Sequence, residues 1–99
     1  MLFHVTVELY PTVVLDGDKR SREVAGPQMQ NIMGSGKVRE AGALSSKRAL
    51  FFLVDIEAPE ELYELFGPEI YGNFAVDAQP VTPVERLGEI FQRWASEGR

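Results

Sequence analysis

The chain has 99 residues, 44% of them hydrophobic, and a formal net charge of −5. This composition predicts one globular domain with a single core, and the negative charge argues against a nucleic-acid partner, because phosphate binding draws its affinity from clustered Lys and Arg. With no cysteine and one histidine, the chain can form no disulfide, thiolate nucleophile or zinc finger, and one subunit cannot build a multi-histidine metal centre.

The first predicted element is a strand at Leu2–Leu9, in which apolar and polar side chains alternate strictly. One face carries Phe3, Val5, Val7 and Leu9. The other face carries His4, Thr6 and Glu8. This alternation indicates a strand with one face on the core. We expect it to end at Tyr10–Pro11, because proline removes a hydrogen-bond donor from the ladder. The polar face points either to water or into a pocket.

Residues Pro11–Asp18 are predicted to form a loop with an Asp-Gly turn. A short basic patch follows, with acidic residues beside it, and consists of Lys19, Arg20 and Arg22. Short charge runs are typical of a solvated loop or helix start, and we favour that interpretation over an anion site.

A first helix is predicted within Lys19–Met33, where three apolar residues share one helical stripe. These are Met29, Ile32 and Met33. Gly34 or Gly36 supplies the stop at the C-terminal end. Pro27 leaves two alternatives open, because the ordered helix can begin at this proline or a longer helix can bend there.

A weaker strand at Val38–Leu44 is followed by the polar turn SSKR and by a strongly apolar strand at Ala49–Ile56. Aromatic and β-branched residues of this kind are typical of a central strand covered on both faces. The longest apolar run, Ala49–Val54, is far shorter than the ~20 residues of a membrane helix. The chain also starts without a basic segment leading into an apolar one. We therefore expect a soluble, cytoplasmic protein with no membrane partner.

A second helix is predicted to begin at Pro59, since proline is tolerated at the first helical position, and to end at Gly67–Pro68. Glu60 and Glu61 lie where the helix dipole favours negative charge. The stripe expected to be buried consists of Leu62, Leu65 and Phe66.

A fourth strand is expected at about Phe74–Val81, and the segment after it has the clearest helix pattern in the chain. We expect Thr82 as the N-cap, Pro83 at the first helical position and Glu85 closing a capping box. The apolar stripe of this third helix is interpreted as a packing face and consists of Val84, Leu87, Ile90, Phe91 and Trp94.

The order β-α-β-β-α-β with a terminal helix is the ferredoxin-like pattern, an α+β fold with a four-stranded antiparallel sheet. In that fold the helices cover one face of the sheet. The other face would carry His4, Thr6, Glu8, Phe51, Leu53 and Asp55. Apolar residues such as Phe51 and Leu53 are unfavourable in bulk water. We therefore expect a homodimer or higher homo-oligomer that brings two open faces together around a cavity.

Four stretches resemble muconolactone isomerase and its relatives, which belong to the dimeric α+β-barrel superfamily of ferredoxin-like subunits. They are MLFHV at the start, SGKVR at Ser35–Arg39, VDIEAPEELYELF at Val54–Phe66 and VTP at Val81–Pro83. The resemblance implies a dimeric barrel and an isomerase acting without a cofactor. Arg39 matches the first arginine of the family's second strand. The sequence departs from the family where the isomerases carry a helix-one carboxylate and a Trp-Arg segment, and the residues there are Ala25, Gly26, Gly42 and Ala43.

Isomerisation of a lactone requires a base that removes a proton next to a carbonyl and an acid that returns one. The candidate catalytic residues are His4, Glu8 and Asp55. The candidate substrate-binding residues are Thr6, Arg39, Phe51, Leu53 and Asp77. A carboxylate desolvated by Phe51 and Leu53 would have its pKa raised toward neutrality and would act as a base. Tyr10 or Tyr71 could polarise a carbonyl.

Each candidate has a structural alternative. His4 can be satisfied by a carboxylate or carbonyl inside a dimer interface, and Glu8, Asp55 and Asp77 can be solvated strand residues. Arg39 can bind a carboxylate through its bidentate fork or form a surface ion pair with Glu40 or another acid.

The sequence favours a small acid/base enzyme that holds an organic acid or lactone. A non-catalytic ligand-binding or oligomer-forming barrel is the main alternative, and a cofactor-independent monooxygenase-like barrel is a third.

Overall fold

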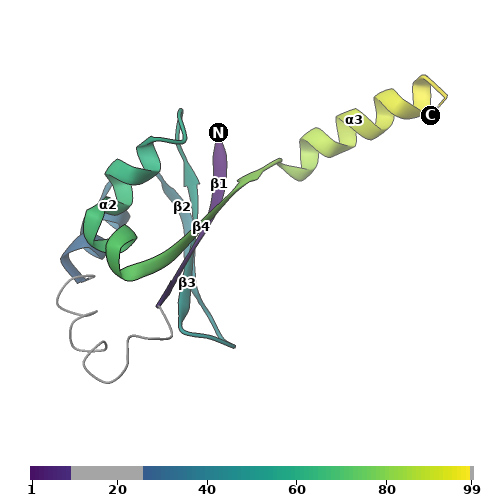
Figure 1. Cartoon of the computed structure of the whole chain (residues 1–99). Helices are drawn as coiled ribbons and strands as arrows, with labels where there is room; N and C mark the ends of the chain where they lie inside the picture. The colour runs from purple at the N-terminus through teal and green to yellow at the C-terminus, as the bar shows by residue number, and fades with distance from the viewer. Residues whose placement is uncertain (10–25, 99) are drawn as a thin grey trace.

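The computed structural model describes residues 1–9 and 26–98, which form a four-stranded antiparallel sheet and three helices in a ferredoxin-like α+β arrangement (Figure 1). In chain order the elements are β1 (Leu2–Leu9), a first helix (residues 26–34), β2 (Val38–Leu44), β3 (Ala49–Asp55), α2 (Glu61–Asn73), β4 (Phe74–Val81) and α3 (Val84–Ser96). The loop expected at Pro11–Asp18, the basic patch after it and Tyr10 lie outside the described residues.

The strands lie in the order β2-β3-β1-β4, and every neighbouring pair is antiparallel. This order confirms the ferredoxin-like topology predicted from the alternation of strand and helix patterns. The strongly apolar β3 lies inside the sheet, and β2 and β4 form its two edges. Val5 of β1 pairs with Phe52 of β3 and with Ala78 of β4, so the apolar face of β1 continues across three strands.

The core lies between this apolar face and two helices, because the first helix and α2 cover the same side of the sheet (Figure 1). Its buried members are Phe3, Val5, Val7, Ile32, Phe52, Val54, Ile56, Leu62, Leu65, Phe66, Ile70 and Phe74. Phe52 of the sheet meets Phe66 of α2 edge to face, with ring centroids 5.4 Å apart. This geometry is one that aromatic pairs prefer. The predicted stripe of α2 is therefore confirmed as a core contact.

The described part of the first helix starts at residue 26, next to Pro27. Whether the helix extends further toward Lys19 concerns residues outside the described ones. The helix ends as expected at a glycine, because Gly36 has a φ of 78°, a conformation that side chains with a Cβ rarely adopt. The Ser35 hydroxyl donates a hydrogen bond of 2.6 Å to the carbonyl of Ile32 and satisfies one of the last helical acceptors.

The second helix begins two residues after the predicted Pro59. Its first residue, Glu61, accepts hydrogen bonds from the backbone N–H groups of Glu57 (2.7 Å) and Ala58 (3.2 Å). These two bonds, with Lys37 3.5 Å away, lower the pKa of the Glu61 carboxyl. The acidic side chain therefore fixes the turn that leads into α2.

The predicted end of this helix at Gly67–Pro68 is wrong in part. Gly67 does leave helical geometry, with φ 79° and ψ 168°, but a second helical segment starts at Pro68 and runs to Asn73. Proline suits the first position of that segment because its missing N–H needs no partner there. The side-chain amide of Gln28, on the first helix, donates a hydrogen bond of 2.9 Å to the carbonyl of Leu65 just before the kink. The glycine and proline therefore form a kink within α2, and do not end it.

The terminal helix α3 differs from expectation at its start. Pro83 occupies the N-cap position in extended backbone (φ −57°, ψ 143°), and no side chain caps the helix. Thr82 therefore lies one residue too early to close the predicted capping box with Glu85. No residue of α3 is buried, so its apolar stripe does not pack on its own subunit. None of the helices among the described residues is long and apolar enough to cross a membrane.

Candidate functional site

The face of the sheet opposite the helices brings most of the predicted site residues together in rows that cross the strands. His4 pairs with Leu53 on one side and with Gln79 on the other. Thr6 in the next row pairs with Phe51 and with Asp77. Residues two apart on one strand share a face, so these side chains all lie on one surface, which we call the open face.

The centre of the open face is a pair of stacked rings. The His4 imidazole and the Phe51 ring are almost parallel, with an angle of 12° and centroids 5.7 Å apart. Gly42 lies opposite Phe51 on the edge strand β2, and a Cβ at this glycine would stand 2.6 Å from Cε1 of the ring. The missing side chain therefore lets Phe51 lie flat against β2. The sequence reasoning did not assign this role to Gly42.

We expect the substitution Gly42→Ala to displace the Phe51 ring and to break its stack with His4. The clash is with a side chain that can rotate, so the fold should survive. His4 is the only histidine in the sequence, so its imidazole proton resonances in an NMR spectrum report the ring current of Phe51 directly. They should move in Gly42→Ala. They should stay in place in Gly72→Ala, where an added Cβ meets nothing within 4 Å. Unchanged His4 resonances in Gly42→Ala would contradict the stacking.

Asp55 lies at one end of the open face and is held by two cations. Its carboxylate accepts a hydrogen bond of 2.7 Å from Nη2 of Arg39 and one of 3.1 Å from the ammonium of Met1. The hydrogen bond from Arg39 comes first among the causes that lower the pKa of Asp55, followed by the Met1 ammonium. The expected rise of this pKa toward neutrality is therefore not found. Arg39 forms an ion pair, as one alternative had it, but with Asp55 and not with Glu40.

This ion pair predicts a specific pH dependence of stability. Because the pKa of Asp55 is lower in the folded chain than its ordinary value of 3.8, the pair stabilises the fold above that value and loses its effect as the pH falls through the folded pKa. The unfolding temperature of the wild type should be higher than that of Asp55→Asn at neutral pH, and the gap between the two temperatures should close below pH 3.8. Arg39→Gln should reproduce the gap. A gap that widens in acid would contradict the assignment.

Glu8 lies at the other end of the open face, where Lys47 of the β2–β3 turn approaches its carboxylate to 3.5 Å. Four residues along a strand separate His4 from Glu8, a distance of about 13 Å. The two side chains of one subunit therefore cannot act on the same proton. Lys47 was missed because the SSKR turn reads as ordinary polar surface, and its proximity to Glu8 follows only from the pairing of β1 with β3.

Tyr71 does not belong to this face. It lies on α2, packs against the core and stacks on Tyr63 with ring centroids 4.6 Å apart. Burial raises its pKa above the ordinary value. Tyr71 therefore cannot polarise a carbonyl bound on the open face. Among residues 1–9 and 26–98, no group of three or more His, Asp or Glu side chains is placed to hold a metal ion.

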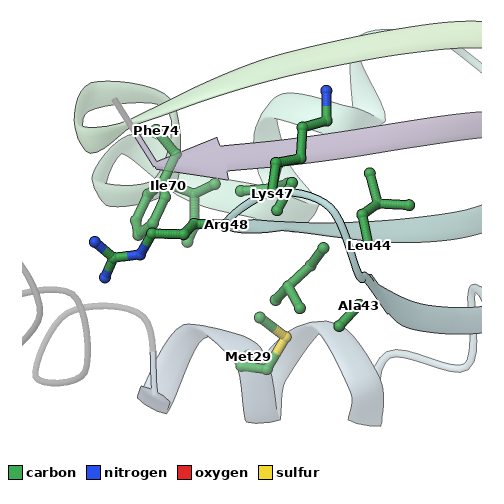
Figure 2. Close-up of a pocket in the computed structure, with 10 residues that line it drawn as sticks. Met29, Ala43, Leu44, Lys47, Arg48, Ile70 and Phe74 are labelled. Carbon is green, nitrogen blue, oxygen red and sulfur yellow. The ribbon is translucent and has the colours of Figure 1, made fainter. Parts of the chain in front are cut away.

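A separate hollow lies on the helix side of the sheet, at the β2–β3 turn. It has a volume of about 350 Å³, and apolar side chains from the first helix, β1–β3, α2 and β4 line it. Figure 2 shows Met29 pointing into this hollow from the first helix, and Lys47 and Arg48 at its mouth with their charged ends turned outward. The hollow does not border His4 or Asp77 and is distinct from the open face.

No family model matches the sequence, and no curated protein matches it. Among solved structures, the chain is similar to 5-chloro-2-hydroxyhydroquinone dehydrochlorinase from Burkholderia phenoliruptrix AC1100, in a complex with 2,5-dihydroxybenzoquinone. The TM-score is 0.62 and the identity 12%, over 83% of this chain and 94% of that one. A likeness at this identity shows a shared fold.

Proposed function

We propose that two copies of this chain bring their open faces together and hold a small organic acid or lactone between them, with His4 moving a proton to or from the bound molecule. The observation that carries the proposal is the make-up of the open face. Phe51 and Leu53 lie in two adjacent rows with His4, Thr6 and Asp77. Apolar surface with a few convergent polar groups is typical of small-molecule sites.

Pairing of two copies follows from the exposure of this face. Leu53 and Phe51 are half-buried in the single chain, and α3 does not cover them because it extends away from the sheet (Figure 1). A second copy would remove their remaining apolar surface from water, which is favourable. The enclosed space would then be poorly hydrated, and charged groups inside it would interact more strongly than in water.

The roles of the site residues follow from their rows. Histidine exchanges protons readily near neutral pH, and Asp77 is the diagonal neighbour of His4 across β1 and β4, about 7–8 Å away. Asp55 lies on the other diagonal of His4, across β1 and β3, but it is paired with Arg39 and the Met1 ammonium. We therefore assign proton transfer to His4 with Asp77 as its carboxylate neighbour, and ligand contact to Thr6. Glu8 and Asp55 are each paired with a cation, so we assign them to holding Lys47 and Arg39 at the two ends of the face.

The solved neighbour supports the class of ligand. It is an enzyme of the same fold, and its structure holds 2,5-dihydroxybenzoquinone, a small oxygenated ring. The lactone or acid we propose has comparable size and polarity, and Arg39 offers a guanidinium for its carboxylate.

The test begins with a screen of small carboxylic acids and lactones by thermal shift, since a bound ligand raises the unfolding temperature. Compounds that bind are then incubated with the protein in D₂O. A base that removes a proton next to a carbonyl introduces deuterium at that carbon, whatever the product. We expect exchange with wild type, and about 10²–10⁴-fold slower exchange with His4→Gln. Glu64→Gln, on the exposed side of α2, is the control.

Three results would count against this function. No compound in the screen stabilises the protein, or exchange continues at the wild-type rate in His4→Gln, or ligands bind and no exchange occurs. The last result would favour a binding protein that carries out no reaction.

A further inference from the structure

The terminal helix α3 presents an apolar stripe that its own subunit leaves unburied. Val84 is 74% exposed, Phe91 54% and Trp94 40%. Phe91 and Trp94 contact each other, with ring centroids 5.5 Å apart, and touch no buried residue of the core. The opposite side of the helix carries the charged residues Glu85, Arg86, Glu89 and Arg93. This division is typical of a helix that packs one face on other protein.

Packing is also needed for α3 to be a helix at all. It has 13 residues with Gly88 in its interior, and isolated helices of that length are marginal in water because nucleation is unfavourable. Glycine lowers helix propensity further. No side chain caps its first turn. The helix therefore depends on a surface that covers its apolar stripe.

The shape of the chain shows that this surface is not on the same subunit. The extended Pro83 directs α3 outward from the end of β4, away from the sheet and from both other helices (Figure 1). The longest dimension is 59 Å and the radius of gyration is 16.9 Å, against about 13 Å for a compact domain of this length. The excess length is α3 itself.

A matching surface lies at the opposite edge of the sheet. There the first helix and β2 form an open apolar trough of about 360 Å³, lined by Met29, Met33, Ala41, Ala43, Leu50 and Phe52. It shares Met29, Ala43 and Leu50 with the hollow at the β2–β3 turn. Met33 is 53% exposed. The small side chains of β2 let a helix approach closely. The β2 residues that line the trough and the hollow, Ala41–Leu44, span about 10 Å of strand, which is about half the length of α3, about 20 Å.

We propose that two copies of the chain exchange their terminal helices, with α3 of each copy packing its apolar stripe into the trough between the first helix and β2 of the other. The sheet order favours this path. The strands β4 and β2 are the two edges of the sheet. When two sheets face each other about a two-fold axis that runs between them and parallel to the strands, β4 of one copy lies beside β2 of the other. The same two-fold axis then places a helix α3 in each of the two troughs, so the dimer is a closed assembly. The inference rests on the pairing proposed above and requires no reaction.

The test uses two features of the sequence, which has one tryptophan and no cysteine. A bimane label, which tryptophan quenches at short range, is attached to Met33→Cys in a Trp94→Phe background. Unlabelled wild type is then added, and subunits are exchanged by dilution and reconcentration. We expect bimane emission to fall with added wild type until it saturates, because Trp94 of the second copy reaches the trough. The control carries the label at Glu64→Cys on the exposed side of α2 and should not respond.

A second readout is the emission of Trp94 in the wild type, which should shift to longer wavelength on dilution as the copies separate. Three results would overturn the exchange. The Met33 label is not quenched although sedimentation shows dimers, or both labels are quenched equally, or Trp94 emission stays the same through dissociation. The first of these leaves sheet pairing intact, and neither readout depends on deuterium exchange, so failure of the exchanged helices is distinguishable from failure of the proposed function.

Discussion

Replacement of Leu53 by lysine is expected to convert the paired protein to a monomer. Leu53 lies in the middle of the open face between His4 of β1 and Glu40 of β2, so pairing would take the new ammonium and the Glu40 carboxylate out of water together. Desolvation costs several kcal/mol per ion, which an ion pair offsets only in part, and we expect roughly a hundredfold loss of association. Each dimer contains two such sites. Sedimentation velocity at several concentrations measures the effect.

The matched control is Glu64→Gln, which changes the net charge by the same single unit on the exposed side of α2. It should leave the association constant unchanged. Circular dichroism of Leu53→Lys should show the wild-type content of strand, because Leu53 faces away from the core, and a loss of helix no larger than the 13 residues of α3, which lose their cover when the copies separate. Dimers of unchanged strength in Leu53→Lys would remove the open face from the interface.

Phe52→Ala is expected to have the largest effect on stability. Phe52 is 1% exposed and packs edge to face on Phe66 between the sheet and α2. Truncation of a buried phenylalanine costs about 3–5 kcal/mol, a large part of the roughly 5–15 kcal/mol that holds a domain folded. Urea denaturation followed by circular dichroism measures the loss.

Phe51→Ala provides the comparison, since the neighbouring ring points to the opposite face of the same strand. In the Leu53→Lys background, where both variants are monomeric, Phe51→Ala should cost less than half as much as Phe52→Ala. In the protein that keeps Leu53 and pairs, Phe51→Ala should lower the affinity for any ligand found by thermal shift. Equal costs for the two phenylalanines would contradict the assignment of their faces.

The alternation of the sequence was enough to predict the sheet and its two faces. Phe3, Val5 and Val7 alternate with His4 and Thr6, and a strand has no other way to separate these side chains. The same pattern predicted the core and the residues of the open face. The order of the strands followed from the arrangement of strand and helix segments, because few topologies accommodate it.

Local signals failed where tertiary contacts or one backbone angle decided the outcome. Gly67–Pro68 is a typical helix end, but α2 continues because its second segment returns Ile70 to the core. Thr82 reads as an N-cap, but the extended Pro83 moves the helix start by one residue. The Arg39–Asp55 ion pair joins residues 16 positions apart, so its lowering of the Asp55 pKa depends on strand pairing and has no local sequence signal.

The apolar stripe of α3 illustrates a further limit. The pattern predicted a packing face, and no residue of α3 is buried in the single chain. A pattern specifies what a helix needs to bury and does not identify the surface that covers it. The single chain leaves that stripe and the open face uncovered. A second copy of the chain, paired as proposed, would cover the stripe and the open face together.

The most direct test of this account is the mass of the wild-type protein in solution across a dilution series, measured by sedimentation equilibrium. Paired open faces predict a species of twice the chain mass, or a multiple of that pair, at micromolar concentration, dissociating to single chains only on further dilution. A particle with the mass of one chain at every concentration, with α3 still helical, would contradict it.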